Sequence, residues 1–130
     1  MLTRRQTFLA LAAACTIAAA APVLAAPQTY DAKVFAAAQA AGKPILLHIT
    51  APWCPTCRAQ KPILSKLEAL PRFKDLVVMN IDFDSQKALL RALRVNQQST
   101  MIVYKGAKEV GRETGDTDPS SIEALLAKAI

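Results

Sequence analysis

The chain has 130 residues, of which 52% are hydrophobic and 20% are charged, and its formal net charge is +6. This length fits one domain. Lysines and arginines are interspersed with acidic residues and form no basic stripe with interleaved aromatics, so nucleic-acid binding is not expected.

The first 25 residues have the features of an export signal. Arg4 and Arg5 precede an apolar run over residues 8–21, and Val23-Leu24-Ala25 forms a small-x-small site for signal peptidase. We expect a signal peptide, 1–25, and a mature periplasmic domain, 26–130. Sec and twin-arginine export both stay open, because the Phe-Leu pair after the arginines lies one residue late for the twin-arginine signal. An uncleaved anchor is the alternative, although the run is short for a membrane span.

The first half of the mature chain predicts two helices and a strand. A short extended lead, residues 26–30, precedes an alanine-rich helix over residues 31–41. Residues 45–50 are nearly all apolar, which is typical of a central strand covered on both faces. Residues 54–70 have helical periodicity, and the side chains expected to face the core are Ile63, Leu64, Leu67 and Leu70.

The second half predicts three strands and two helices. An apolar strand over residues 76–81 is followed by a helix over residues 85–93. Two strands joined by a turn cover residues 100–104 and 109–114. Asp118 followed by Pro119 is a helix cap with proline at the first helical position, so the last helix runs from there to the end. This order predicts an α/β fold with a mixed central sheet of about four strands and helices on both faces.

Cys54 and Cys57 are the cysteines that export would leave, because Cys15 lies in the apolar run of the signal peptide. The thiolate is the reactive form of cysteine, and an unperturbed thiol titrates near pH 8.5. At a helix start, backbone amides and the helix dipole would stabilise a charge on Cys54. Cys57 lies one turn on, within reach of a mixed disulfide on Cys54. Pro55 suits the first turn because its missing N–H costs nothing there.

A pair of cysteines with this spacing can also bind a metal or act as a structural bridge. A structural zinc site takes four protein ligands. Apart from Cys54 and Cys57 the exported chain would have no second cysteine pair and only one histidine, His48, so it could not complete such a site within one chain. A Cys54–Cys57 bridge closes too small a loop to be a strong structural staple. Two rivals remain: a metal-binding or metal-delivery protein that uses the pair with a partner, and a non-catalytic adaptor. For a redox pair no cofactor is expected.

Several further residues accompany the pair. An apolar strand ends in Ala51-Pro52-Trp53-Cys54, Pro62 follows Cys57 by five residues, and Asn80-Ile81-Asp82 follows the next strand. A strand, turn and strand over residues 100–114, Gly115 and a terminal helix complete the pattern. Over residues 31–130 the chain resembles the thioredoxin superfamily, which implies a thioredoxin-like three-layer fold.

The residues around the cysteines narrow the resemblance. The segment WCPTCRA, residues 53–59, is similar to the active site of exported thioredoxin-like reductases that serve cytochrome c maturation. The opening helix and residues 42–44 also resemble the periplasmic thioredoxin-like domain of the membrane electron conduit that feeds them. Both resemblances imply disulfide reduction outside the cytoplasm.

The resemblance implies roles for residues and partners. Cys54 would be the nucleophile, Cys57 the resolving thiol, and Trp53 a flat surface beside them, with Pro55 and Thr56 between the cysteines. The substrates would be protein disulfides, the electron source a membrane or periplasmic redox donor, and the protein a monomer. An oxidase would run the same steps backwards, and the Pro-Thr dipeptide does not fix the direction.

Two positions depart from the family pattern. His48 stands where thioredoxins carry a buried acid, and Val78 aligns with the lysine that accompanies it. His48 could relay a proton, or it could be a hydrogen-bonded core residue. Ser99 replaces the cis-proline that precedes the position of Thr100, which puts substrate binding and metal exclusion in doubt. We expect a trans peptide bond there, with the Ser99 hydroxyl either offered to the site or filling the loop.

Overall fold

A computed structural model describes residues 27–130, so the expected signal peptide, 1–25, lies outside the described residues. A five-stranded sheet runs in the order β1-β3-β2-β4-β5. Strands β1 and β2 are parallel to β3, whereas β4 is antiparallel to β2 and β5 is antiparallel to β4. The strands are β1 (Gln28–Thr29), β2 (Pro44–Thr50), β3 (Val77–Asp82), β4 (Thr100–Lys105) and β5 (Lys108–Thr114).

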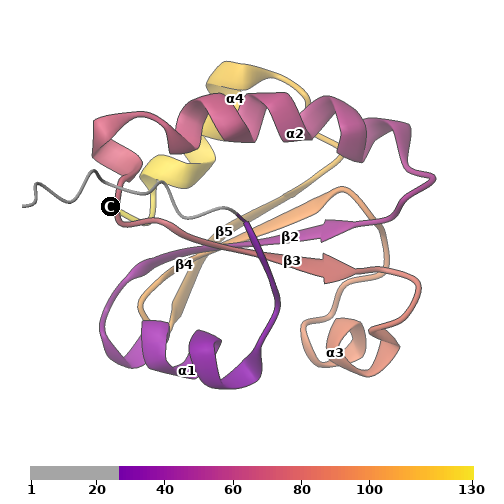
Figure 1. Cartoon of the computed structure of the whole chain (residues 1–130), viewed down its shortest axis with the longest axis horizontal. Helices are drawn as coiled ribbons and strands as arrows, with labels where there is room; N and C mark the ends of the chain where they lie inside the picture. The colour runs from indigo at the N-terminus through magenta and orange to yellow at the C-terminus, as the bar shows by residue number, and fades with distance from the viewer. Residues whose placement is uncertain (1–26) are drawn as a thin grey trace, which may run out of the picture.

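Within residues 27–130, helices cover both faces of the sheet: in Figure 1, α2 and α4 lie on one face, and α1 and α3 on the other. Their bounds are α1 (Ala32–Ala40), α2 (Pro55–Glu68), α3 (Lys87–Ala92) and α4 (Pro119–Ala127), with a short 3₁₀ helix, η1 (Pro71–Phe73), after α2. The predicted three-layer α/β architecture is therefore confirmed. None of the helices within residues 27–130 is long and apolar enough to cross a membrane.

Strand β2 divides the core because its side chains alternate between the two faces. Ile45, Leu47 and Ile49 belong to the apolar cluster on the side of α1 and α3. Leu46 belongs to the cluster beneath α2 and α4. His48 has the same parity as Leu46, so its side chain also lies beneath α2, where a polar partner is needed.

Side-chain caps explain where two helices begin. The Asp31 carboxylate accepts hydrogen bonds from the N–H groups of Lys33 (2.8 Å) and Val34 (2.9 Å) at the start of α1. Asp118 accepts one from the N–H of Ser121 (2.7 Å), and Pro119 is the first residue of α4. These caps satisfy amides that have no partner within the helix, and they confirm the predicted Asp118-Pro119 start.

The sequence interpretation needs three corrections. The sheet has five strands rather than about four, because the extended lead pairs with β3 through Gln28 and Thr29. Helix α2 ends at Glu68, so Leu70 is 37% exposed instead of facing the core. Helix α3 begins at Lys87 rather than at residue 85, because the Asp82 carboxylate binds the backbone N–H groups of residues 84 and 85 and holds them in a turn.

Candidate redox site

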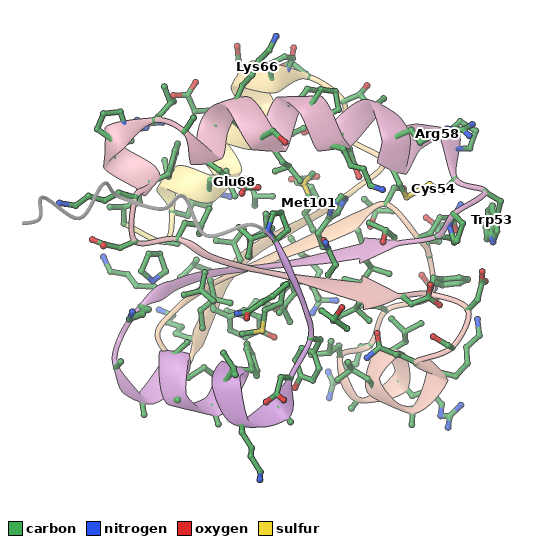
Figure 2. All side chains as sticks on the ribbon, viewed as in Figure 1. Trp53, Cys54, Arg58, Lys66, Glu68 and Met101 are labelled. Carbon is green, nitrogen blue, oxygen red and sulfur yellow. A yellow bond between two sulfur atoms is a disulfide. The ribbon has the colours of Figure 1, made fainter. Side chains whose placement is uncertain are left out.

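The cysteine pair lies at the start of α2, just after the end of β2. Cys54 occupies the N-cap of α2, Pro55 is the first helical residue, and Thr56 is half-buried in the first turn. Cys54 and Cys57 form a disulfide, with their Cα atoms 5.3 Å apart. Figure 2 shows Cys54 and Trp53 together at this end of the sheet.

The two sulfurs have opposite polar surroundings. Cys54 Sγ accepts a hydrogen bond from the backbone N–H of Cys57 at 3.0 Å. Cys57 Sγ instead lies 4.0 Å from the carbonyl oxygen of Ile49. A donor stabilises negative charge on sulfur, whereas a carbonyl oxygen favours a protonated thiol that can donate to it. After reduction, the surroundings therefore favour a thiolate at Cys54 over one at Cys57.

Both sulfurs are covered, because each cysteine is only 1% exposed. Ala51 packs with the pair, and Phe83, from the segment after β3, packs against this small cluster. Burial among apolar groups disfavours a charged thiolate and so favours the uncharged disulfide.

Trp53 extends the site outward. It is 54% exposed, and its Nε1–H donates to the Asp84 carboxylate at 2.9 Å. Parallel pairing of β2 and β3 brings the residues that follow each strand to the same edge of the sheet. Sequence reasoning missed the role of Asp84, although this pairing, together with an acidic residue just after β3, is the signal that could have found it.

His48 is buried and has one hydrogen-bond partner within residues 27–130. Its Nε2 lies 2.8 Å from Oε1 of Gln60, one turn beyond Cys57 on α2. Burial lowers the pKa of His48, the hydrogen bond to Gln60 raises it in opposition, and the positive charge of Lys61 lowers it further. His48 is therefore a neutral imidazole near pH 7.

Gln60 is the second buried residue that sequence reasoning missed. It is fully buried, and its Nε2 donates to the carbonyl oxygens of Ser99 (3.1 Å) and Asp116 (2.9 Å). Gln60 precedes Leu64 by four residues and Leu67 by seven, so it continues the stripe of α2 that faces the core. A polar residue within that apolar stripe was the available signal.

The segment before β4 holds Ser99 by its backbone. No peptide bond in residues 27–130 is cis, as expected at Ser99, whose φ of 59° lies in the left-handed region that is unfavourable for serine. Its N–H donates to the Ile49 carbonyl (2.8 Å), and its carbonyl oxygen accepts from Gly115 N–H (3.0 Å) as well as from Gln60. The Ser99 hydroxyl donates to the Gln98 carbonyl, so its proton is directed to its own loop.

Thr100 lies next to Ser99 but bonds toward β5. Its hydroxyl donates to the Gln97 carbonyl (2.8 Å) and lies 3.0 Å from the hydroxyl of Thr114. The structure thus groups the predicted site residues in three sets. Trp53, Cys54, Pro55, Thr56 and Cys57 lie at or just before the start of α2. His48 is linked to Ser99 through Gln60, and Thr100 joins β4 to β5.

A cavity of about 150 Å³ lies beside His48, between α2 and β3. Its polar lining residues besides His48 are Lys61, Ser65, Glu68 and Asn80. Burial raises the pKa of the half-buried Glu68. Within the part of the chain that the structure describes, no three His, Cys, Asp or Glu side chains are grouped as metal ligands.

Comparisons with known proteins agree with this geometry. The Thioredoxin family model matches residues 22–128. The thioredoxin of Chlamydia trachomatis is 32% identical over 85 residues, which cover 65% of this chain and 80% of that protein. The thiol:disulfide interchange protein DsbE of Escherichia coli is 35% identical over 74 residues, 57% of this chain but only 39% of DsbE.

A solved structure extends the likeness to the fold. Trxlp from Edwardsiella tarda EIB202 superposes with a TM-score of 0.75 at 42% sequence identity. The superposition covers 78% of this chain and 98% of Trxlp. The similarity therefore spans nearly the whole of the Trxlp chain.

Proposed function

Because the chain belongs to the thioredoxin family and is a thiol–disulfide oxidoreductase, we propose that it reduces protein disulfides outside the cytoplasm. The observation that carries this proposal is the polar asymmetry of the pair: a donor N–H at Cys54 Sγ and a carbonyl oxygen near Cys57 Sγ. It supports Cys54 as the nucleophile and Cys57 as the resolving thiol.

In the proposed cycle, the Cys54 thiolate attacks one sulfur of a substrate disulfide. A mixed disulfide forms, and the other substrate sulfur leaves as a thiolate that takes up a proton. Cys57 then loses its proton and attacks Cys54 Sγ, which releases the second substrate thiol and leaves the Cys54–Cys57 disulfide. The substrate gains two electrons and the pair loses two, so a membrane or periplasmic dithiol donor must restore them by a second exchange.

The covered position of the sulfurs supports the reducing direction. Ala51 and Phe83 pack against the pair, and both cysteines are buried. Burial disfavours the charged thiolate of the reduced pair relative to the uncharged disulfide, which favours loss of electrons from the reduced pair. The export part of the proposal rests on the signal-like residues 1–25 and implies a mature chain that begins at Ala26.

The surrounding residues would shape the site. Trp53, fixed by Asp84, offers a flat surface on which a substrate chain can lie, and Pro55 and Thr56 form the rim between the sulfurs. His48 would accept the proton of Cys57, while Ser99, just before β4, and Thr100, the first residue of β4, would border the site. We propose that the protein acts as a monomer.

Trapping with Cys57→Ser tests the cycle. Without the resolving thiol, Cys54 should stay joined to its substrate, so oxidised insulin should yield a disulfide adduct detectable by mass spectrometry. The wild type should speed insulin reduction by dithiothreitol at least about tenfold. Cys54→Ser is the matched control and should give neither adduct nor catalysis. A Cys54→Ser protein as active as the wild type would contradict the proposal and favour the adaptor.

The same variant tests the location. When the full chain with Cys57→Ser is produced in a Gram-negative host, the adducts should lie in the periplasmic fraction and the protein should begin at Ala26. Retention of the intact chain in the cytoplasm would overturn the export part alone.

A further inference from the structure

Gln60 joins segments that are distant in sequence. From α2 its side chain contacts His48 on β2, the backbone of Ser99 before β4, and the backbone of Asp116 before α4. Since Gln60 is fully buried, its amide has no access to water. Each of its polar atoms must therefore find its partner among these groups.

The two carbonyl partners fix the orientation of the amide. The oxygens of Ser99 and Asp116 can only accept hydrogen bonds, so the Gln60 group facing them must be its NH₂. A flipped amide would set its oxygen against both carbonyl oxygens and remove the hydrogen bond that each of them accepts from Gln60. Oε1 therefore faces His48 Nε2, 2.8 Å away, and can only accept from it.

We propose that Gln60 is a positioning residue for His48: it holds the neutral imidazole as the Nε2–H tautomer and leaves Nδ1 as the nitrogen that takes up a proton. This deepens the proposed function, on which it rests for the role of His48 as proton acceptor. Protonation at Nδ1 keeps the Nε2–H···Oε1 hydrogen bond intact. His48 can thus gain and lose a proton without disturbing the Gln60 contacts that hold Ser99 and Asp116.

The groups around His48 leave Gln60 as its tautomer-setting contact. Helix α2 supplies Lys61, whose charge acts on His48, and Glu68, which lines the same cavity. The residues paired with His48 on the neighbouring strands are Asn80 on β3 and Met101 on β4, and neither is titratable. Within residues 27–130, Nδ1 has no hydrogen-bond partner, and His48 lines the 150 Å³ cavity from which a proton could reach it.

The single histidine makes the test direct, because each ring nitrogen gives one NMR signal in ¹⁵N-labelled protein. At about pH 8, above the ordinary histidine pKa of about 6.5, the wild type should show a protonated Nε2, an unprotonated Nδ1 and a slowly exchanging Nε2–H. Gln60→Met, of similar shape but without an acceptor, should lose the slow proton, and its His48 pKa should fall. Gln60→Glu keeps an acceptor, so it should keep the tautomer and raise the pKa.

Lys66→Gln is the matched control, since Lys66 lies on the outer side of the same helix (Figure 2) and should change neither signal. The pH profile of insulin reduction should shift with the His48 pKa, in opposite directions in the two Gln60 variants, which a purely structural role would not produce. A proton on Nδ1 in the wild type, or an unchanged tautomer and pKa in Gln60→Met, would overturn the proposal.

The test separates this inference from the proposed function. The tautomer is read in the resting protein, so it stands or falls whether or not insulin is reduced. If Gln60→Met does not fold, the wild-type tautomer and the direction of the Gln60→Glu shift still decide the outcome.

Discussion

At the scale of single residues, His48 places a base where thioredoxins carry a buried acid, so burial shifts its pKa in the opposite direction. A buried carboxyl group resists losing its proton, whereas a buried imidazole resists gaining one. Burial lowers the pKa of His48 below its ordinary value of 6.5. At pH values between the lowered pKa of His48 in the folded state and 6.5, the unfolded chain binds more protons than the folded one. The stability that neutral His48 contributes is therefore fully present above about pH 6.5, and this contribution is lost as the pH falls toward the pKa of His48 in the folded state.

This sign gives a prediction for His48→Asn. The free energy of unfolding of the wild type, measured by urea denaturation, should fall between pH 7 and pH 5 by at most about 1.4 kcal/mol per pH unit from this residue. The variant should lose that slope. Burial raises the pKa of Glu68, which contributes stability that is lost as the pH rises, so Glu68→Gln is a control that should steepen the slope. Parallel wild-type and His48→Asn curves would contradict the prediction.

At the scale of elements, the sequence predicts what depends on periodicity and caps. Strands β2 and β3 are mostly apolar, and α4 begins at its aspartate cap as expected. Strand β1 was missed because two exposed residues have no pattern, and only their pairing with β3 makes them a strand. The partner of His48 was missed for a similar reason: the spacing places Gln60 inward, but only the packed fold shows which carbonyl groups lie there.

The start of α2 predicts unequal reactivity of the two thiols. In Cys57→Ser, Cys54 keeps the backbone N–H of residue 57 as a donor, whereas in Cys54→Ser the remaining Cys57 lies near the Ile49 carbonyl. A helix N-terminus is worth about 1 kcal/mol to a negative charge, or roughly fivefold in thiolate. Iodoacetamide at pH 7 should therefore modify Cys54 at least about fivefold faster. In urea the two variants should react equally, and a faster Cys57 in the folded proteins would refute the assignment of roles.

At the scale of the whole molecule, the fold makes one edge of the sheet reactive. Parallel β2 and β3 end at the same edge, where α2 begins just after Trp53 and the segment after β3 supplies Phe83 and Asp84. The sequence predicts this edge because it predicts the order of strands and helices. It does not predict how deeply the sulfurs lie, because their 1% exposure depends on Phe83 packing from another part of the chain.

The burial of the two sulfurs links the direction of electron flow to the difference in stability between the oxidised and the reduced protein. Oxidation and unfolding form a thermodynamic cycle. The oxidised and reduced proteins therefore differ in unfolding free energy by an amount proportional to the difference in reduction potential between the unfolded and the folded pair. For two electrons, 30 mV corresponds to about 1.4 kcal/mol. A folded pair that is held at a lower potential than the same pair in the unfolded chain is the stronger reductant, and its oxidised form is then the more stable one.

We therefore expect the oxidised protein to unfold at higher urea concentration than the reduced protein, by on the order of 1–2 kcal/mol. For a four-residue loop the chain-entropy relation by itself gives about 2 kcal/mol, so loop closure can supply a difference of this size. The burial of Cys54 and Cys57 against Ala51 and Phe83 acts in the same direction. The Cys54→Ser/Cys57→Ser double variant should be insensitive to dithiothreitol. A more stable reduced form would mean that folding raises the reduction potential of the pair, which would contradict this prediction and remove the support that burial gives to the reducing direction.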